Sequence, residues 1–357
     1  MKAEIKPRIN LEGRTRLETV IPLEAPYIVF VDPASACNFQ CSFCPTGHRD
    51  LIRDTGRYQG AMKFEVFTKI IDDLSAFSRP IKVLRLYKDG EPFLNRRLAD
   101  MIAYAKASGQ VDYVDTTTNG TFLSPERLAP VLEAGLDKIN ISVDGMTPEQ
   151  YRRFTGVDFD FDGFVRNVRW LYDNKGDCEV VVKIPGELIS EAQRQDFFDT
   201  FGDHCDRIFI ENFAPCWPQF DIEAHTGVTI SQGIYQQPVG ETETCPYIFY
   251  GISVNADGLV SSCFLDWGRK LVVGDVRTTS LKDIWNAPAL NALRLQHLEG
   301  RRRENAVCGG CGQLSHCLPD NIDPYRGELL ARFKATVQLD PSVPAPGGTV
   351  ALPAAAE

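Results

Sequence analysis

Residues 27–44 read YIVFVDPASACNFQCSFC, and they join a short apolar run to a loop that carries three cysteines. The run Tyr27–Val31 is rich in β-branched and aromatic residues, which is typical of a buried β-strand. Cys37, Cys41 and Cys44 then follow within eight residues. Three thiols are one fewer than a closed zinc site needs, and they are too crowded for a simple disulfide. This stretch therefore predicts a metal centre directly after a strand, with one coordination position that no cysteine fills.

Short apolar runs alternate with amphipathic segments of helical length from residue 27 to residue 213. The predicted strands are Tyr27–Val31, Ile81–Tyr87, Tyr113–Thr118, Lys138–Val143, Glu179–Ile184 and Arg207–Phe213. The predicted helices are Lys63–Phe77, Arg97–Ser108, Ser124–Ala134, Pro148–Asn174 with a break near Gly156, and Ser190–Phe201. This alternation indicates a parallel sheet, because each parallel connection needs a covering helix. Six units fit either an open doubly wound sheet or a partial barrel of the TIM type.

A polar or glycine-containing cluster follows each predicted strand at its carboxyl end. In chain order the clusters are CNFQCSFC, Asp89-Gly90-Glu91-Pro92, Asn119-Gly120, Ser142-Val143-Asp144-Gly145, Pro185-Gly186-Glu187 and Ala214-Pro215-Cys216-Trp217. In a βα barrel, the loops at this end of the strands build the active site. The six clusters together favour an α/β fold in which a partial (β/α)6 barrel of the TIM type carries one shared site.

Composition and charge exclude several classes of protein. The 357 residues have a formal net charge of -10, whereas binding to a nucleic-acid backbone normally requires a basic surface. No window approaches the roughly 20 apolar residues that span a bilayer, and the N-terminus has no apolar run of signal-peptide length. We therefore expect a cytoplasmic protein that binds neither nucleic acid nor membrane. In that reducing compartment, 11 cysteines point to metal binding or catalysis before disulfides.

The rest of the chain divides around this barrel. Residues 1–25 are polar and read as an N-terminal extension, residues 26–213 form the barrel, and the irregular residues 214–240 form a bridge. A small α+β module is predicted over residues 241–323, and residues 324–357 are predicted to form a C-terminal helix and a disordered tail. The small module has a hairpin turn at Asn255-Ala256-Asp257-Gly258 and one helix over Ser280–Leu298. The tail from Pro341 is rich in proline, glycine and alanine, a composition that cannot bury a core.

Two kinds of metal centre fit the first cysteine loop. A four-iron, four-sulfur cluster is normally held by four thiolates, so three thiolates leave one iron with an open coordination site. Zinc would need a fourth ligand, for which His48, four residues after Cys44, is the nearest candidate.

The spacing C-x-x-x-C-x-x-C directly after a first strand resembles the signature of the radical S-adenosylmethionine (SAM) enzymes. The resemblance implies a partial barrel of six βα units and a SAM molecule whose amine and carboxylate chelate the open iron of a [4Fe-4S] cluster. It also implies that one electron splits the sulfonium bond, giving methionine and a 5′-deoxyadenosyl radical that takes a hydrogen from the substrate. A flavodoxin- or ferredoxin-type protein would supply that electron.

The resemblance extends to the clusters after the first two strands. Phe43 occupies the aromatic position between the last two cysteines, which in the family packs against the adenine. Asp89-Gly90-Glu91-Pro92 resembles the family's Gly-Gly-Glu-Pro, in which the carboxylate accepts hydrogen bonds from the methionyl ammonium. Here Asp89 replaces the first glycine, and Gly90 and Glu91 are kept.

Later strands carry further matches. Asn119 lies in the family's Thr-Asn-Gly turn, and Ser142 with Asp144 resembles the Ser-x-Asp-Gly turn that contacts the carboxylate and ribose of SAM. Many relatives have an arginine before the glycine at position 156, where this chain has Thr155, so that Arg152 or Arg153 would have to meet the SAM carboxylate instead. Alone, each of these polar residues reads as ordinary turn chemistry. In register with the cysteine loop, the SAM-binding interpretation is favoured.

A second set of cysteines follows the bridge. Its spacing suits either zinc or an iron–sulfur cluster, and it resembles the SPASM and shorter twitch extensions of radical SAM enzymes, which hold auxiliary four-iron clusters. A full SPASM pattern has seven or more cysteines and two clusters, so this shorter set implies one auxiliary cluster with four ligands. Cys317 is then either spare or a substitute ligand. The four implied ligands are Cys245, Cys263, Cys308 and Cys311.

The remaining thiols are separated by their position along the strands. Cys178 and Cys205 precede predicted strands, at the end of a barrel that serves stability, and read as packing residues. Cys216 follows the last barrel strand, at the reactive end. It is either a hydrogen-atom donor to a substrate radical, as in family members that epimerise carbon centres, or a small apolar filler.

These inferences predict a radical SAM oxidoreductase or epimerase. We expect a small polar substrate, such as a sugar, an aminocyclitol or a sugar nucleotide, because roughly 25 residues before the first strand are too few for a leader-binding domain. The alternative within the family is a maturase of a ribosomal peptide. The alternative from another class is a non-catalytic zinc-binding scaffold.

Overall fold

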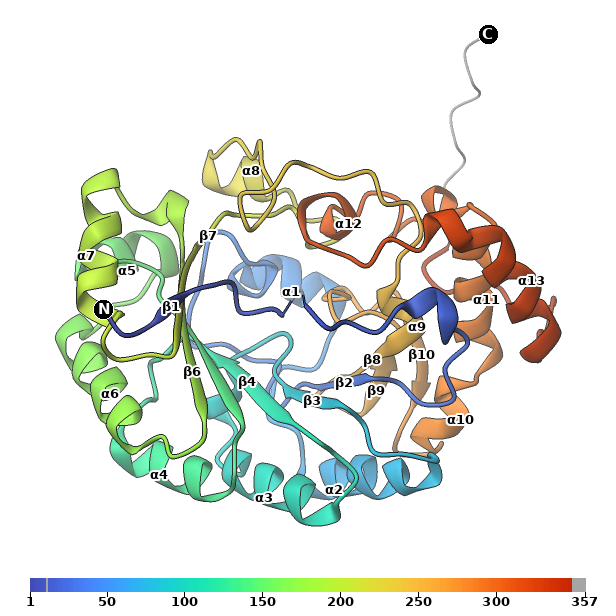
Figure 1. The fold of residues 1–357 in the computed structure, drawn as a ribbon, viewed down its shortest axis with the longest axis horizontal. Helices are drawn as coiled ribbons and strands as arrows, with labels where there is room; N and C mark the ends of the chain where they lie inside the picture. The colour runs from blue at the N-terminus through green and yellow to red at the C-terminus, as the bar shows by residue number, and fades with distance from the viewer. Residues whose placement is uncertain (11, 349–357) are drawn as a thin grey trace, which may run out of the picture.

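One ten-stranded sheet runs through the computed structural model, which describes residues 1–10 and 12–348 (Figure 1). Its strand order is β1-β7-β6-β5-β4-β3-β2-β8-β9-β10. Every pairing from β1 to β8 is parallel, and β8–β9 and β9–β10 are antiparallel. The ordered strands β2 to β7 confirm the predicted partial barrel. The strands are β1 Glu4–Ile5, β2 Ile28–Val31, β3 Val83–Leu86, β4 Val114–Thr118, β5 Lys138–Ser142, β6 Glu179–Pro185, β7 Arg207–Glu211, β8 Gly251–Val254, β9 Leu259–Ser261 and β10 Val272–Asp275.

Helices cover the outer face of the barrel strands, as Figure 1 shows for α2, α3, α4, α6 and α7. Ser124 and Pro125 begin α4 at the predicted position, and the Thr147 side chain accepts a hydrogen bond from Gln150 N at the start of α5. The helices are α1 Arg49–Thr55, α2 Phe64–Asp73, α3 Leu98–Ser108, α4 Pro125–Glu133, α5 Pro148–Thr155, α6 Phe161–Asn174, α7 Glu191–Phe201, α8 Ile222–Thr226, α9 Tyr247–Tyr250, α10 Leu281–Trp285, α11 Pro288–Leu298, α12 Gln313–His316 and α13 Arg326–Thr336. Among the described helices, none has the length and apolar character needed to cross a bilayer.

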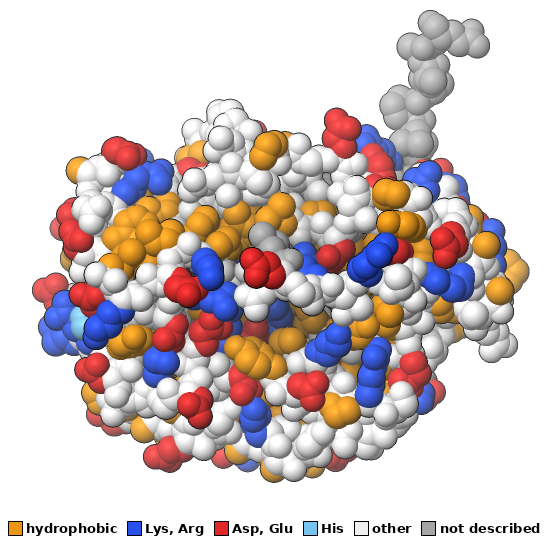
Figure 2. All heavy atoms as spheres, viewed as in Figure 1, with side chains coloured by type: hydrophobic (Ala, Val, Ile, Leu, Met, Phe, Trp, Pro, Cys, Tyr) orange, Lys and Arg blue, Asp and Glu red, His pale blue; other side chains and the backbone are white. Residues whose placement is uncertain are grey.

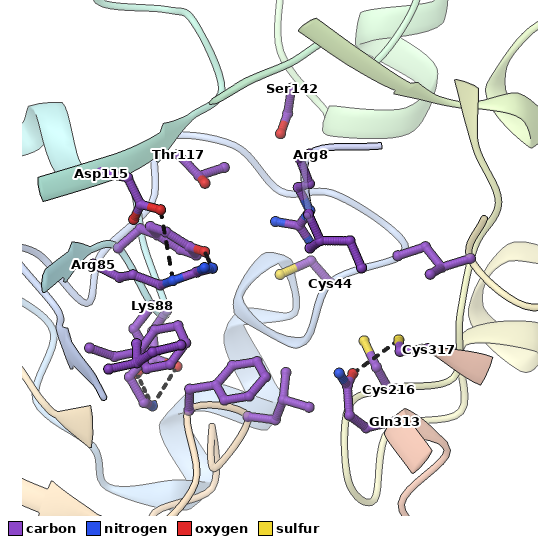
Figure 3. Close-up of a pocket in the computed structure, with 18 of the residues that line it drawn as sticks. Arg8, Cys44, Arg85, Lys88, Asp115, Thr117, Ser142, Cys216, Gln313 and Cys317 are labelled. Atoms are coloured by element: carbon purple, nitrogen blue, oxygen red, sulfur yellow. Dashed lines mark hydrogen bonds and ion pairs between the residues drawn. The ribbon is translucent and has the colours of Figure 1, made fainter. Parts of the chain in front are cut away.

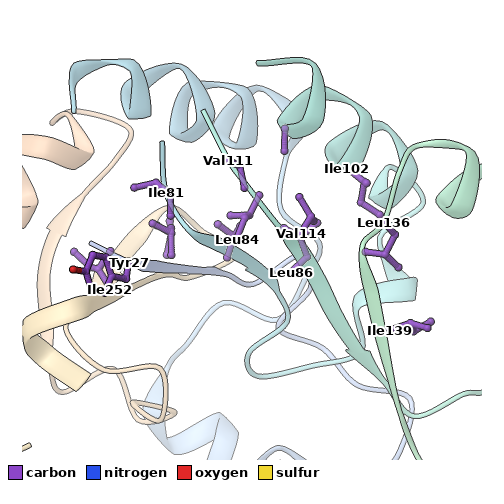
Figure 4. Close-up of a cluster of buried hydrophobic side chains, with 14 of the residues drawn as sticks. Tyr27, Ile81, Leu84, Leu86, Ile102, Val111, Val114, Leu136, Ile139 and Ile252 are labelled. Atoms are coloured by element: carbon purple, nitrogen blue, oxygen red, sulfur yellow. The ribbon is translucent and has the colours of Figure 1, made fainter. Parts of the chain in front are cut away.

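The hydrophobic core lies between the sheet and these helices. Leu84 and Leu86 of β3, Val114 of β4 and Ile139 of β5 are completely buried and gather under the helices (Figure 4). Burying such a side chain contributes about 1.5–3 kcal/mol. Because successive strand residues point to opposite faces, residues between these positions, such as Arg85, point into the barrel. The core therefore anchors the strands and leaves the inner face free for polar residues.

The N-terminal segment is part of the barrel rather than a separate extension. Strand β1 adds to the edge of β7 in parallel register, and Leu17 and Ile21 are buried in the main core. From β1 the chain crosses the front of the molecule to the C-terminal module (Figure 1). There Arg14 Nη2 lies 2.6 Å from Asp320 Oδ2. The sequence showed only polarity here, since a strand of two residues leaves no periodic pattern.

The C-terminal module continues the barrel sheet, because β8 pairs with the opposite edge, on β2. The predicted hairpin is confirmed, with Gly258 at a φ of 93° in the turn between β8 and β9. The single helix predicted over Ser280–Leu298 is wrong. Two helices, α10 and α11, stand there, since the chain leaves the helical conformation at Ala287 and restarts at Pro288.

The start of the predicted disordered tail is held by hydrogen bonds. Asn305 Nδ2 donates to Pro346 O at 2.8 Å, and Ala306 N donates to Gly348 O at 3.2 Å. Asn305 and Ala306 thus hold the backbone of Pro346 and Gly348 in place. Composition alone did not indicate these contacts. Residues 349–357 of the predicted tail lie outside the described residues.

Candidate active site

A cavity of about 860 Å³ lies inside the partial barrel. The inner faces of the strands, the loops that follow them and the N-terminal segment around Arg8 all contribute to its wall. Figure 2 shows charged side chains of both signs around the hollowed centre of this face, with hydrophobic side chains gathered above it. Figure 3 shows residues from several elements pointing into the same space.

The three cysteines of the first loop, Cys37, Cys41 and Cys44, all line this cavity. The end of helix α5 holds the loop, because Gln40 N donates to Thr155 O at 2.8 Å and Ser42 N donates to Phe154 O at 3.0 Å. Within the loop, Gly47 N donates to Cys44 O at 2.9 Å. A strand, a helix end and a tight turn thus position all three thiols.

The donor set of this loop fits an iron–sulfur cluster. Burial raises the pKa of Cys37 to about 12, and the charges of Cys37 and Cys44 add to the effect of burial in raising the pKa of Cys41. Thiolates placed together in this way need a strongly positive centre to be stable. A Cβ atom on Gly47 would overlap the Cys41 carbonyl oxygen and lie 2.6 Å from Cys41 N. The loop is therefore wound as tightly as a glycine allows.

His48, the fourth ligand of the zinc alternative, lies away from these thiols. It is not among the residues that line the cavity, and its Nε2 is 3.0 Å from Ser42 O. Its ring packs against His225, with ring centroids 4.2 Å apart. Across residues 1–10 and 12–348, no group of three or more His, Cys, Asp or Glu side chains is arranged around one metal ion. The arrangement of His48 therefore lends no support to a closed zinc site.

Glu91 is buried at the cavity wall with its carboxylate held by three donors. Thr118 Oγ1 and Phe93 N donate to Oε1 at 2.8 and 3.0 Å, and Asn119 N donates to Oε2 at 2.8 Å. Burial nevertheless outweighs these bonds and raises the pKa of Glu91 to about 7. A cation placed in the cavity beside Glu91 would favour its ionised form. Next to it, a Cβ on Gly90 would overlap the Ala36 carbonyl oxygen, so that this position requires glycine.

Asp89 has a different environment from Glu91. Its carboxylate has three cationic partners, Lys88 Nζ at 3.0 Å, Arg269 Nη2 at 2.6 Å and Arg57 Nη1 at 3.7 Å. The Asp89 side chain is fully buried. Although burial opposes ionisation, these cations lower the pKa of Asp89. The SAM contact predicted for Asp89 stays a prediction. In the structure its carboxylate forms ion pairs with the three buried cations.

Asn119, Ser142 and Asp144 line the cavity at the ends of β4 and β5. Asn119 Nδ2 donates to Asn38 Oδ1 at 2.9 Å and lies 3.8 Å from Cys37 Sγ, which ties this turn to the cysteine loop. Burial raises the pKa of Asp144 to about 7; Lys183 acts against this shift, and the Glu91 charge adds a smaller upward contribution. Two acidic groups with raised pKa values thus face the same space.

Phe43 also lines the cavity and packs against Phe213, with ring centroids 5.1 Å apart. The two arginines suggested as substitutes for the missing family arginine do not line it. Arg152 Nε donates to Asp158 Oδ1 at 2.7 Å in an exposed position, and the Arg153 guanidinium lies 5.0 Å from the centre of the Phe154 ring. Neither side chain lines the cavity in which a SAM carboxylate would lie.

The second set of cysteines is divided by the structure. Burial raises the pKa of Cys245 to about 12, and neighbouring thiols of the set add to the shifts of Cys245, Cys263 and Cys308. Cys311 belongs to the same group, since its charge contributes to all three of these shifts. None of the four lines the large cavity of the described chain. The four thiols that the resemblance implied as ligands therefore lie near one another, and their role as ligands stays a prediction.

Cys317 differs from these four because it lines the cavity, together with Cys216. It still lies near the group, since the Cys311 charge adds to the effect of burial in raising the pKa of Cys317. Its Sγ donates to Gln313 Oε1 at 3.2 Å. Burial raises the pKa of Cys216 well above its usual value, and the Cys317 charge is the next largest cause. Figure 3 shows both sulfur atoms at the same side of the cavity. Cys178 and Cys205 are buried in the core, as predicted.

Among the cavity residues missed from the sequence are Arg8, Arg85, Asp115 and Thr117. Arg85, Asp115 and Thr117 stand at inward positions of β3 and β4. Their polar side chains within predicted strands were a readable signal, since a covered barrel interior is normally filled with branched apolar side chains. Arg8 had no such signal, because only the pairing of β1 with β7 brings its segment to the cavity.

Comparisons with known proteins match both halves of the chain. The model of the radical SAM superfamily matches residues 31–197, and the model of the SPASM iron–sulfur cluster-binding domain matches residues 245–312. A GTP 3′,8-cyclase from Shewanella denitrificans is 34% identical over 162 residues, which are 45% of this chain and 44% of that protein. The chain spans less than half the length of such curated relatives.

Two solved structures share the fold at low sequence identity. BtrN in complex with AdoMet and 2-DOIA has a TM-score of 0.50 and 19% identity, covering 80% of this chain and 92% of BtrN. SuiB from Streptococcus suis, bound to the precursor peptide SuiA, has a TM-score of 0.57 and 14% identity, covering 84% of this chain and 73% of SuiB. With the cysteine loop, the barrel and the second cysteine group in place, the chain belongs to the radical SAM superfamily and carries a C-terminal SPASM iron–sulfur cluster-binding domain.

Proposed function

We propose that this radical SAM enzyme cleaves SAM reductively and removes a hydrogen atom from a small polar substrate, which it dehydrogenates or epimerises. The observation that carries the proposal is one cavity lined by Cys37, Cys41 and Cys44, by the buried carboxyls of Glu91 and Asp144, and by a separate thiol, Cys216. When bound, a [4Fe-4S] cluster at the three cysteines supplies the electron that splits the sulfonium bond.

The residues around the cysteine loop are proposed to bind and orient SAM. Glu91, held rigidly by its three donors, would accept the methionyl ammonium, and Asp144 with Ser142 would take the carboxylate end and ribose. Asn119 would position this turn against the cysteine loop through Asn38. Phe43 would provide an apolar surface for the adenine. A cation beside Glu91 and Asp144 would relieve the cost of burying two carboxylates.

One auxiliary [4Fe-4S] cluster is proposed at Cys245, Cys263, Cys308 and Cys311. Four thiolates would saturate it, so that it would relay an electron rather than bind substrate. The Arg302 guanidinium donates to Cys308 O. Burial raises the pKa values of Cys308 and Cys311, and the Arg302 charge opposes that rise, as a cationic neighbour of thiolate ligands should. Cys317 is not needed in this set. A flavodoxin- or ferredoxin-type protein is the proposed source of electrons.

Cys216 separates the two proposed outcomes. Donating a hydrogen atom requires a protonated thiol, and burial keeps Cys216 in that form. If the substrate radical takes this hydrogen, the carbon centre is epimerised; if its electron leaves through the auxiliary cluster, the substrate is dehydrogenated.

A small substrate is favoured by the size and lining of the cavity. About 860 Å³ falls within the range of small-molecule sites, and SAM would occupy part of that space. The fold by itself does not choose the substrate, because both BtrN with 2-DOIA and SuiB with a precursor peptide share it. The second candidate, peptide maturation, rests on that likeness to SuiB.

Anaerobic purification followed by iron analysis and turnover tests the proposal. We expect about eight irons per chain and 5′-deoxyadenosine when SAM and dithionite are supplied. Cys37→Ala should abolish 5′-deoxyadenosine, whereas Cys178→Ala, at a buried core thiol, should retain it. Cys216→Ala should abolish an epimerised product and spare a dehydrogenated one. A colourless protein with two zinc ions and no SAM cleavage would instead support the zinc scaffold.

A further inference from the structure

The inner wall of the barrel carries a group of polar side chains that SAM binding does not use. Arg85 of β3 and Asp115 of β4 are direct neighbours in the parallel register, and Thr117 stands two residues further along the same face of β4. All three line the cavity. Figure 3 shows Asp115 and Thr117 pointing toward the same space as Arg8. These residues form what we call the β3–β4 wall.

Several polar atoms of the β3–β4 wall have no hydrogen-bond partner within the described chain. They are Arg85 Nε, Asp115 Oδ1 and Thr117 Oγ1. Asp115 is 4% exposed, and among the described residues its one ion pair closer than 4 Å, to Arg85 Nε, is long at 3.7 Å. Buried polar groups are nearly always hydrogen-bonded in native proteins, and each exception calls for an explanation. A ligand in the cavity is such an explanation.

The arrangement of charges selects the kind of ligand. A carboxylate and a guanidinium side by side offer an acceptor next to several donors, and a hydroxyl group can both donate and accept. Two neighbouring hydroxyls therefore satisfy Arg85 and Asp115 together, and Thr117 can bond either one. An anionic ligand fits less well, because it would be repelled by Asp115. The nearby cations Lys138 and Arg8 are already paired, with Glu179 at 3.2 Å and with Glu211 at 3.4 Å.

We propose that the β3–β4 wall, Arg85, Asp115 and Thr117, binds two neighbouring hydroxyl groups of a polyhydroxylated substrate, a sugar or a cyclitol. This rests on the proposed function, whose SAM-binding residues lie on the loops that follow the same strands. Arg85 is pre-oriented for the role, since its Nη1 donates to Tyr87 Oη at 2.7 Å. The wall would hold the hydroxyls while the rest of the ring faces the SAM end of the cavity.

Calorimetric titration of the anaerobically reconstituted enzyme with SAM bound and no reductant tests this wall. The probes are myo-inositol, glucosamine and 2-deoxystreptamine, with cyclohexanol as the compound that lacks neighbouring hydroxyls and inorganic phosphate as the anion. Wild type should bind at least one of the three polyols and not cyclohexanol. Asp115→Ala and Arg85→Ala should each weaken that binding by about tenfold or more, because each removes a hydrogen bond to a charged group.

Thr117→Val removes the hydroxyl but nearly keeps the shape of the side chain, and it should weaken polyol binding by about threefold to tenfold. This variant tests the wall even if the charge variants fail to fold. Asp112→Ala, at an exposed position just before β4, is the matched control and should bind as wild type does. Failure of all three polyols to bind, binding that is unchanged in Asp115→Ala and Thr117→Val, or a preference for phosphate would each overturn the proposal. Formation of 5′-deoxyadenosine by wild type is measured separately, so a failed wall and a failed SAM function are distinguished.

Discussion

Two buried carboxyl groups at the cavity, those of Glu91 and Asp144, should make the stability of the protein depend on pH. Glu91 and Asp144 both have pKa values raised to about 7, chiefly because burial penalises their charged forms. Without a bound cation, the folded protein must either protonate them or bear buried charges. A positively charged ligand beside them would favour their ionised forms.

Asp144→Asn should stabilise the SAM-free protein in a pH-dependent way. The folded state keeps a proton on Asp144 up to a pKa of about 7, whereas the unfolded chain loses it near the usual pKa of 3.8. The free energy of unfolding of the wild type therefore falls as the pH rises from 3.8 to about 7. Above that range the full cost of burying the Asp144 charge is present. The variant's gain should grow from pH 5 to pH 7 and then level off, reaching at most about 4 kcal/mol.

Urea unfolding of both proteins at pH 5, 6, 7 and 8 measures this gain. The exposed Asp54→Asn variant serves as the control for loss of a carboxylate. A gain that is the same at every pH, or a loss at pH 8, would show that burial does not dominate at Asp144.

At the level of elements, the cysteine loop depends on close backbone contact. Its N–H groups bond to carbonyls at the end of α5, and Gly47 brings the following turn against Cys41. Helix α5 then ends at Gly156, at a φ of 71°, next to the Gln40 side chain. The three thiols are thus placed by the packing of one turn against another, with little room for any side chain.

Gly47→Ala should disrupt the first metal site while leaving the second intact. The new Cβ would overlap backbone atoms of Cys41, which cannot move aside without opening the loop. We expect iron content to fall by about four per chain and 5′-deoxyadenosine formation to be lost. Gly327→Ala in α13, where a Cβ meets nothing within 4 Å, is the matched control. Full iron content in Gly47→Ala would contradict this account of the loop.

At the scale of the whole molecule, the barrel and the SPASM module share one sheet and one hydrophobic core. Strand β8 extends the sheet from β2, and one hydrophobic core includes residues of both parts. A buried group of charges also joins them, since Asp89 pairs with Arg57 and Lys88 of the barrel and with Arg269 of the module. Asp89, at the position where the predicted family motif has its first glycine, thus links the barrel to the second domain.

Asp89→Gly, which restores the family motif, should therefore destabilise this protein. Removing the anion leaves three buried cations without their partner, a loss that typically costs about 3–5 kcal/mol. Urea unfolding measures the loss, and faster hydrogen exchange in β10 would show loosening of the module. The double variant Asp89→Gly, Arg269→Ala should recover part of the stability, because it removes one unpaired charge. Wild-type stability in Asp89→Gly would show that the charges find other partners.

Much of the fold followed from local patterns. The six barrel strands match their predicted runs, differing at the ends by up to two residues, because each is short, apolar and bounded by turn residues. One helix was predicted over Ser280–Leu298 where the structure has two, because the apolar spacing continues across Pro288. A proline can either begin a new helix or bend an existing one, and the spacing does not tell which. The N-terminal strand escaped prediction because its partner β7 is about 200 residues away.

Sequence alone determined the chemistry of the protein: three cysteines after a strand, a Glu-Pro motif, and a second cysteine group, since spacing along the chain limits which ligands one loop can offer. Tertiary structure alone decided which residues share the cavity. It brought Arg8 in from the N-terminal segment, set Cys317 beside Cys216 at the cavity, and enclosed Asp89 among cations. These outcomes depend on contacts between distant segments, whose geometry is set by packing of the sheet and not by local sequence.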